Sequence, residues 1–175
     1  MDLVGSAYLY VLAAVSTTFV GFSALIMTFR QATGGGLSRF ESFVTQVFVH
    51  LGFLVTAGSL TPPLLALCGL DAGWIWRGCS IGVAVVVGLF GVTYPARRRA
   101  VSGAATPLVI RIDAALLAVM ALAFVSNAAG WPTAPGAGLY AFGLTGTLFV
   151  TGLGYLHALG GLSRGVPGDR NDAGA

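Results

Sequence analysis

Long apolar runs, separated by short clusters of polar and turn-forming residues, make up most of this chain. A helix needs roughly 17–25 predominantly apolar residues to cross a lipid bilayer, and the runs reach that length. The pattern predicts five membrane-spanning helices, at residues 3–28, 40–60, 75–95, 107–129 and 138–161. No linker or low-complexity block divides them, so we expect one all-α integral membrane domain over residues 1–162, a bundle of five transmembrane helices. The polar, glycine-rich residues 163–175 are expected to form a disordered cytoplasmic tail.

Helix start and stop signals agree with these boundaries. Ser38 and Glu41 have the spacing of a capping box at the start of the second span. The fourth span opens with Thr106-Pro107, an N-cap residue followed by a proline suited to the first helical position. Thr61-Pro62-Pro63 predicts that the second span ends or kinks there, and that the LLALCGL segment after it forms a short helix at the surface.

The amino-acid composition excludes a soluble domain. Of the 175 residues, 56% are hydrophobic and only 9% are charged, against roughly a quarter in soluble proteins. The net charge of +3 comes from arginines scattered at helix ends, which is not a nucleic-acid-binding pattern. The abundance of Gly, Ala and Arg is typical of a GC-rich bacterial genome, so we expect a multi-pass protein of the bacterial inner (cytoplasmic) membrane. Its expected partners are the lipid bilayer and either a second copy or another membrane protein, with no nucleic acid.

The distribution of arginine predicts the orientation. Counting polar segments from the N-terminus, eight arginines fall in alternate segments and only Arg77 falls in the others. Basic loops remain cytoplasmic, so we expect the N-terminus outside and the C-terminus inside, which requires an odd number of spans. Trp74, Trp76 and Trp131 all lie near the predicted outer interface, where tryptophan anchors helices. A four-span alternative, in which the first or third run does not cross, stays open.

The second span carries polar residues on one side. On a helical wheel, Glu41, Gln46 and His50 fall on one half, whereas apolar residues such as Phe48, Leu51 and Val55 fall on the other. An unmatched polar group in hydrocarbon costs about 2–7 kcal/mol by transfer scales. We therefore expect the polar half to face the bundle interior and the apolar half to face lipid.

The predicted orientation places nine polar residues in the cytoplasmic half of the membrane, among them Arg30, Tyr94 and Tyr155. The other six are the candidate pathway or ligand residues: Glu41, Gln46, His50, Arg111, Asp113 and His157. His50 is the strongest candidate, because an ionisable group well inside a span is functional by default. Structural roles compete with this reading: Glu41 suits a helix cap, Arg111 and Asp113 could form an interfacial ion pair, and His157 lies near the inner end of its span.

The residue types and motifs that the sequence lacks argue against several activities. The nine basic residues are all arginine, which removes every lysine-based chemistry, including a Schiff base. No CxxC, HExxH, P-loop or GxGxxG motif is present, so we predict no catalytic residue, metal or cofactor and favour a protein that is not an enzyme. A haem between His50 and His157 is disfavoured, because their depths differ by about 8 Å at 1.5 Å per residue. Cys68 and Cys79 are expected to be unpaired.

These observations favour a small channel or transporter, homo-oligomeric, which moves protons or a small solute through a path with a polar cytoplasmic vestibule. A second hypothesis is a non-catalytic membrane subunit or regulator that docks another membrane protein through small-residue helix faces, such as Gly78 and Gly82 in GxxxG spacing. A third is an intramembrane ligand-binding protein or enzyme.

Overall fold

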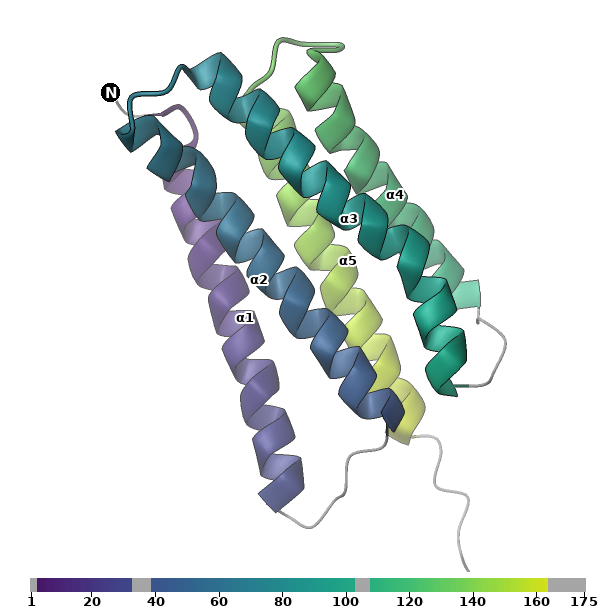
Figure 1. Ribbon diagram of the computed structural model, residues 1–175. Helices are drawn as coiled ribbons and strands as arrows, with labels where there is room; N and C mark the ends of the chain where they lie inside the picture. Colours follow the sequence, from purple (N-terminus) through teal and green to yellow (C-terminus); the bar gives the residue numbers. More distant parts are fainter. Residues whose placement is uncertain (1–2, 33–38, 103–107, 164–175) are drawn as a thin grey trace, which may run out of the picture.

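Five helices make up the fold (Figure 1). The computed structural model describes residues 3–32, 39–102 and 108–163, and every regular element within these ranges is a helix. The helices are α1 (Ser6–Ala32), α2 (Arg39–Leu67), α3 (Ala72–Ser102), α4 (Leu108–Ala129) and α5 (Ala137–Ser163). All five are long and apolar enough to cross a membrane, which confirms the predicted all-helical fold and its five helices of spanning length. Apart from Ser163 itself, the expected tail lies outside the described residues, as do Ser38, Thr106 and Pro107.

Four of the helices form a bundle, and the remaining helix, α1, lies beside it. α2, α3, α4 and α5 pack in that order, and α5 closes the group by packing against α2. α1 packs mainly along α2, and Figure 1 shows it at the edge of the molecule. Successive helices run in opposite directions, so the turns at 68–71 and 130–136 share one end (Figure 1). The other end holds the starts of α2 and α4 and the last turns of α1, α3 and α5.

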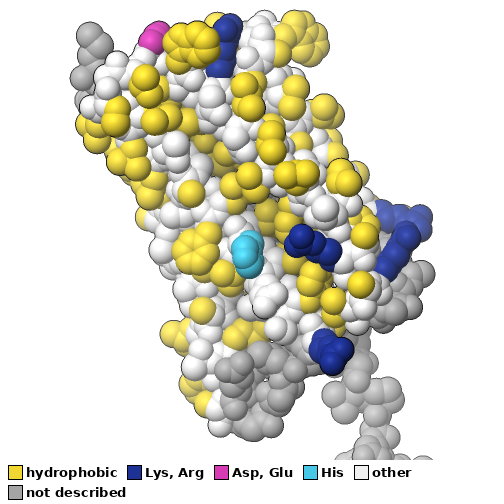
Figure 2. All heavy atoms as spheres, in the orientation of Figure 1, with side chains coloured by type: hydrophobic (Ala, Val, Ile, Leu, Met, Phe, Trp, Pro, Cys, Tyr) yellow, Lys and Arg dark blue, Asp and Glu magenta, His cyan; other side chains and the backbone are white. Residues whose placement is uncertain are grey.

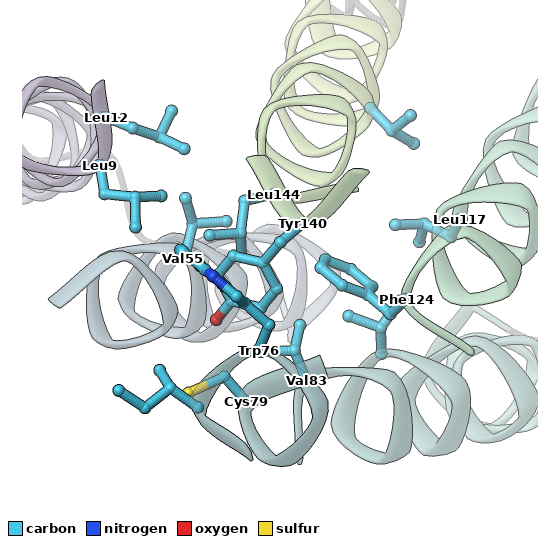
Figure 3. Packing of buried hydrophobic residues seen from close by; sticks show 13 residues of the cluster. Leu9, Leu12, Val55, Trp76, Cys79, Val83, Leu117, Phe124, Tyr140 and Leu144 are labelled. Carbon is cyan, nitrogen blue, oxygen red and sulfur yellow. The ribbon is translucent and has the colours of Figure 1, made fainter. Parts of the chain in front are cut away.

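An aromatic cluster fills the bundle near the turns (Figure 3). Tyr140 of α5 is fully buried, and its ring centroid lies 5.6 Å from those of both Trp76 and Phe124. Val55 and Leu144 pack into the same core. Trp76 is therefore a core residue and not the interfacial anchor that its sequence position predicts, whereas Trp74 and Trp131 are 73% and 72% exposed.

The second helix continues through its two prolines. Pro62 and Pro63 lie inside α2, and Pro62 has no N–H to donate to the carbonyl of Gly58 one turn earlier. The Tyr140 hydroxyl donates to that carbonyl at 2.7 Å. Neighbouring side chains that satisfy a freed carbonyl let a membrane helix tolerate proline. Of the two predicted outcomes, an end or a kink, the end of the span at these prolines is wrong, and so is the separate short helix after it.

Close contact between α1 and α2 depends on one glycine and a group of hydroxyls. A Cβ at Gly52 would collide with the side chain of Val20. Ser16 and Thr56 share a hydrogen bond of 2.7 Å across the same interface. Both helices therefore approach closely and satisfy their polar atoms with each other, which suits helix packing in lipid.

A buried amide ties the α4–α5 turn to α3. Asn127 is 1% exposed, and its Nδ2 donates to the Ser80 hydroxyl at 2.8 Å. Its Oδ1 accepts a hydrogen bond of 3.0 Å from the backbone N–H of Gly136, just before α5 begins. Asn127 therefore has a structural role that depends on both partners.

Candidate functional site

Charged side chains are concentrated at the end of the bundle away from the two turns, which we call the arginine-rich end. The exposed side chains of Arg39, Arg97, Arg99 and Arg111 lie there, on α2, α3 and α4. Figure 2 shows this uneven distribution of charge on one face of the molecule. Hydrophobic side chains are spread over the face, whereas most of the dark blue basic side chains lie in its lower half. Because this chain contains no lysine, all of that basic surface is arginine.

Asp113 is the most unusual polar residue at this end. It lies in α4, a few residues inside the candidate span Ile110–Ala129. Its Oδ2 atom is buried and has no hydrogen-bond partner. This oxygen lies against α5 at Gly154, where an added Cβ would stand 3.5 Å from it. An added Cβ there would be in ordinary van der Waals contact with the oxygen, so the carboxylate packs directly against α5.

The neighbours of Asp113 come from two other helices. His157 on α5 lies within electrostatic reach of the Asp113 carboxylate, and that carboxylate lies within electrostatic reach of Tyr94 of α3. Tyr94 is also within electrostatic reach of Arg98, one turn further along α3. α3, α4 and α5 thus bring a carboxylate, an imidazole, a phenol and a guanidinium together, and we call Tyr94, Arg98, Asp113 and His157 the acid–base cluster.

Aromatic contacts with α2 hold one side of this cluster in place. The rings of Phe43 and Tyr94 stack with centroids 5.8 Å apart. The Arg98 guanidinium lies 5.5 Å from the centroid of the Phe40 ring, within the range of a cation–π interaction. Arg98 is only 7% exposed, so its side chain packs into this end of the bundle, unlike the exposed Arg97 and Arg99.

The two central candidates of the second span do not join the cluster. The side chains of Gln46 and His50 are exposed, and His50 Nδ1 bonds the carbonyl of Gln46 in its own helix at 2.6 Å. Phe48, Leu51 and Val55, which were expected to face lipid, are instead 2%, 3% and 0% exposed. The predicted orientation of α2 is therefore wrong for these residues: in the single chain, its apolar half enters the bundle and this polar pair points outward.

The other candidate residues outside the second span's central pair, apart from Asp113, lie in different surroundings. Glu41 lies in α2, but its side chain is outside the described residues. Arg111 is exposed, and the buried Asp113 Oδ2 has no bond to it, because residues two apart on a helix point in different directions. His157 is exposed at the edge of the acid–base cluster. The structure therefore brings together Asp113 and His157 out of the six predicted residues.

Tyr94 and Arg98 were missed as site residues. Phe90, Tyr94 and Arg98 recur every four residues, which places them on one side of α3. That spacing could have identified an inward-facing polar stripe in the last turns of α3. Arg98 stands between Arg97 and Arg99, which are both exposed. The three consecutive arginines together have the pattern of a basic loop, so the inward-facing position of Arg98 could not be distinguished.

Comparisons with known proteins give no relative. No protein-family model matches the chain, and neither curated proteins nor solved structures give a significant match.

Proposed function

We propose that this protein transports protons, or a small solute together with a proton, as a multi-pass protein of the bacterial inner membrane. Asp113 is the proposed proton-binding group. The observation that carries the proposal is its buried, unpartnered Oδ2 inside a candidate membrane span. Carboxylates at such positions are costly and mark proton or ion pathways in membrane proteins. In the proposed orientation, with the N-terminus outside, the arginine-rich end is cytoplasmic.

The surroundings of Asp113 suit reversible protonation. The Asp113 Oδ2 atom, buried without a hydrogen-bond donor, is the oxygen that would take up the proton. His157 is exposed beside it, and an imidazole ring can both accept and release a proton, so it can exchange protons with water. Tyr94 adds a hydroxyl within electrostatic reach. A proton would pass between the cytoplasm and Asp113 through His157.

The core at the other end favours a carrier over an open pore. Tyr140, Trp76 and Phe124 pack together in the bundle between the turns and the acid–base cluster. These rings block a straight aqueous path through the centre of the single chain. Release on the outer side would therefore require helices or aromatic side chains to move, and the permeant would have to be small.

Proton flux into liposomes tests the proposal. The purified protein is reconstituted with a pH-sensitive dye inside, and the rate of internal pH change is followed after an external pH step. We expect faster equilibration than in protein-free liposomes, and a return to the protein-free rate for Asp113→Asn. Asp71→Asn is the matched control, because Asp71 is exposed in a turn outside the candidate spans. Equal flux from Asp113→Asn and the wild-type protein would refute the role of Asp113.

A second candidate function is that of a docking subunit for another membrane protein. Gly78 and Gly82 on α3 are exposed, and a Cβ at either would meet nothing within 4 Å. Small residues on an outward face let another helix approach closely. Isolation from native membranes with one stoichiometric partner, lost when Gly82 is changed to Leu, would favour this candidate.

A further inference from the structure

One side of α2 has no partner among the described residues of the bundle. Its exposed side chains recur at alternating steps of four and three residues, at Gln46, His50, Phe53, Ala57, Leu60, Leu64 and Leu67. Such spacing places them in one stripe, which we call the outer face of α2. The opposite side of the helix holds the buried Phe48, Leu51 and Val55.

The hydrogen bond of His50 determines what it can offer a partner. The carbonyl of Gln46 can only accept, so the Nδ1–H of His50 must donate in their 2.6 Å bond. In the neutral ring, Nε2 then carries the lone pair and is an acceptor. His50 is exposed, so this acceptor is available at the outer face.

Lipid is a poor environment for these two side chains. Gln46 and His50 both lie inside the candidate span Ser42–Leu67, and His50 is about 12 Å from the start of that span at 1.5 Å per residue. Hydrocarbon offers no partner for the Gln46 amide or for the Nε2 of His50. The Gln46 side-chain amide donates hydrogen bonds, whereas Nε2 accepts them, so one copy of the face complements another.

We propose that the outer face of α2 is a homodimer interface. Two copies inserted in the same direction are related by a two-fold axis along the membrane normal, so their α2 helices run parallel. Each Gln46 amide donates to the His50 of the partner subunit, and the symmetry repeats this bond. The small side chain of Ala57 lets the two helices approach near the middle of the span. This proposal is independent of proton transport.

A second copy fits this face better than it fits the other outward-facing stripe. The glycines of α3 at positions 78, 82, 88 and 91 have no atom within 4 Å of an added Cβ, yet they carry no polar side chain that lipid leaves unpaired. The outer face of α2 carries both a donor and an acceptor. It therefore needs a partner, and its self-complementarity identifies that partner as the same chain.

Disulfide cross-linking in membranes tests the geometry. Ala57→Cys and, as the matched control, Gly82→Cys on α3 are introduced separately into a Cys68→Ser protein, which retains only the buried Cys79. We expect oxidation to give a covalent dimer from Ala57→Cys and not from Gly82→Cys. The reverse result, or no covalent dimer from either variant, would overturn the proposal.

Dimer dissociation in detergent tests the hydrogen bonds. Gln46→Leu and His50→Leu should each weaken dimerisation about tenfold, a factor equivalent to about 1.4 kcal/mol, within the range of an interhelical hydrogen bond in membranes. The double variant should be little weaker than either single variant, because both remove the same bond. Thr18→Leu is the control, since Thr18 is exposed on α1 and bonds only its own helix at Ala14. A monomeric wild-type protein, or independent additive effects at Gln46 and His50, would contradict the proposal.

Discussion

The hydroxyl of Tyr140 supplies the hydrogen bond that Pro62 cannot give to the carbonyl of Gly58. The bond is 2.7 Å long and joins positions 82 residues apart in the sequence, on α5 and α2. It satisfies the carbonyl that the first of two consecutive prolines leaves free, within a helix that continues to Leu67. The same tyrosine ring forms the centre of the aromatic cluster, so the continuity of α2 and the packing of the bundle depend on one residue (Figure 3).

Removing the Tyr140 hydroxyl should destabilise the fold. Tyr140→Phe keeps the ring but leaves a buried carbonyl without a donor, which costs about 1–3 kcal/mol. Thermal or denaturant unfolding of the purified protein in detergent would measure the loss. Tyr10→Phe, at a side chain that is 52% exposed, should have little effect.

A double-variant cycle separates this bond from general packing. Pro62→Ala restores an N–H that can donate to Gly58, so Tyr140→Phe should cost less in that background. An unchanged cost in the Pro62→Ala protein would mean that the tyrosine does not act by replacing the missing backbone donor.

Substituting Asn127 should loosen the turn between α4 and α5. Asn127→Ala removes the donor to Ser80 and the acceptor for the N–H of Gly136, and we expect a loss of about 1–3 kcal/mol for each buried group left unpaired. Protease cleavage within 130–136 should accelerate together with the loss of thermal stability. Ser126→Ala, one residue earlier, should leave both measurements near wild type. Wild-type cleavage of the Asn127→Ala protein would show that the amide does not hold the turn.

Replacing glycine with alanine should lower the stability of the protein at Gly52 of α2 but not at Gly21 of α1. Gly52→Ala places a methyl group against Val20, a β-branched side chain with little rotamer freedom, so α1 and α2 must separate. Overpacking of this kind costs about 1–3 kcal/mol. Gly21→Ala meets no atom within 4 Å and should be neutral or stabilising, since alanine favours helix by up to about 1 kcal/mol. Unfolding of the two variants side by side would check the prediction, and equal stabilities would contradict the close α1–α2 contact.

Thiol labelling should report the orientation in the membrane. Cys68 is exposed at the turn between α2 and α3, whereas Cys79 is buried. With the N-terminus outside, a membrane-impermeant maleimide should modify Cys68 in intact cells, and Cys68→Ser should abolish the signal. Labelling only after the cells are broken would indicate the opposite orientation.

Much of the architecture could be predicted because it depends on local properties of the chain. The number of helices follows from the length of each apolar run relative to bilayer thickness, and the observed candidate spans overlap all five predicted ones. The helix bounds were less accurate at prolines. The predicted third span ended at Pro95, whereas α3 continues to Ser102.

The candidate site could be predicted only in part. Asp113 and His157 were recognisable as ionisable residues within or near predicted spans, and α4 and α5 bring them into electrostatic reach. Tyr94 and Arg98 join them only because the last turns of α3 pack beside those helices. Gln46 and His50 separate from them because α2 turns its other side to the bundle.

Five long apolar helices with arginine concentrated toward one end follow from length, hydropathy and charge, because these properties can be read along the chain without knowing any contact. Which side of each helix is buried depends on the contacts between helices, and these appear only in the folded bundle. In a membrane, an apolar side chain is stable against lipid or protein, so hydropathy does not select the buried side of α2. That choice came from shape, as Gly52 admits Val20 and the rings of Phe48 and Tyr155 pack 4.5 Å apart.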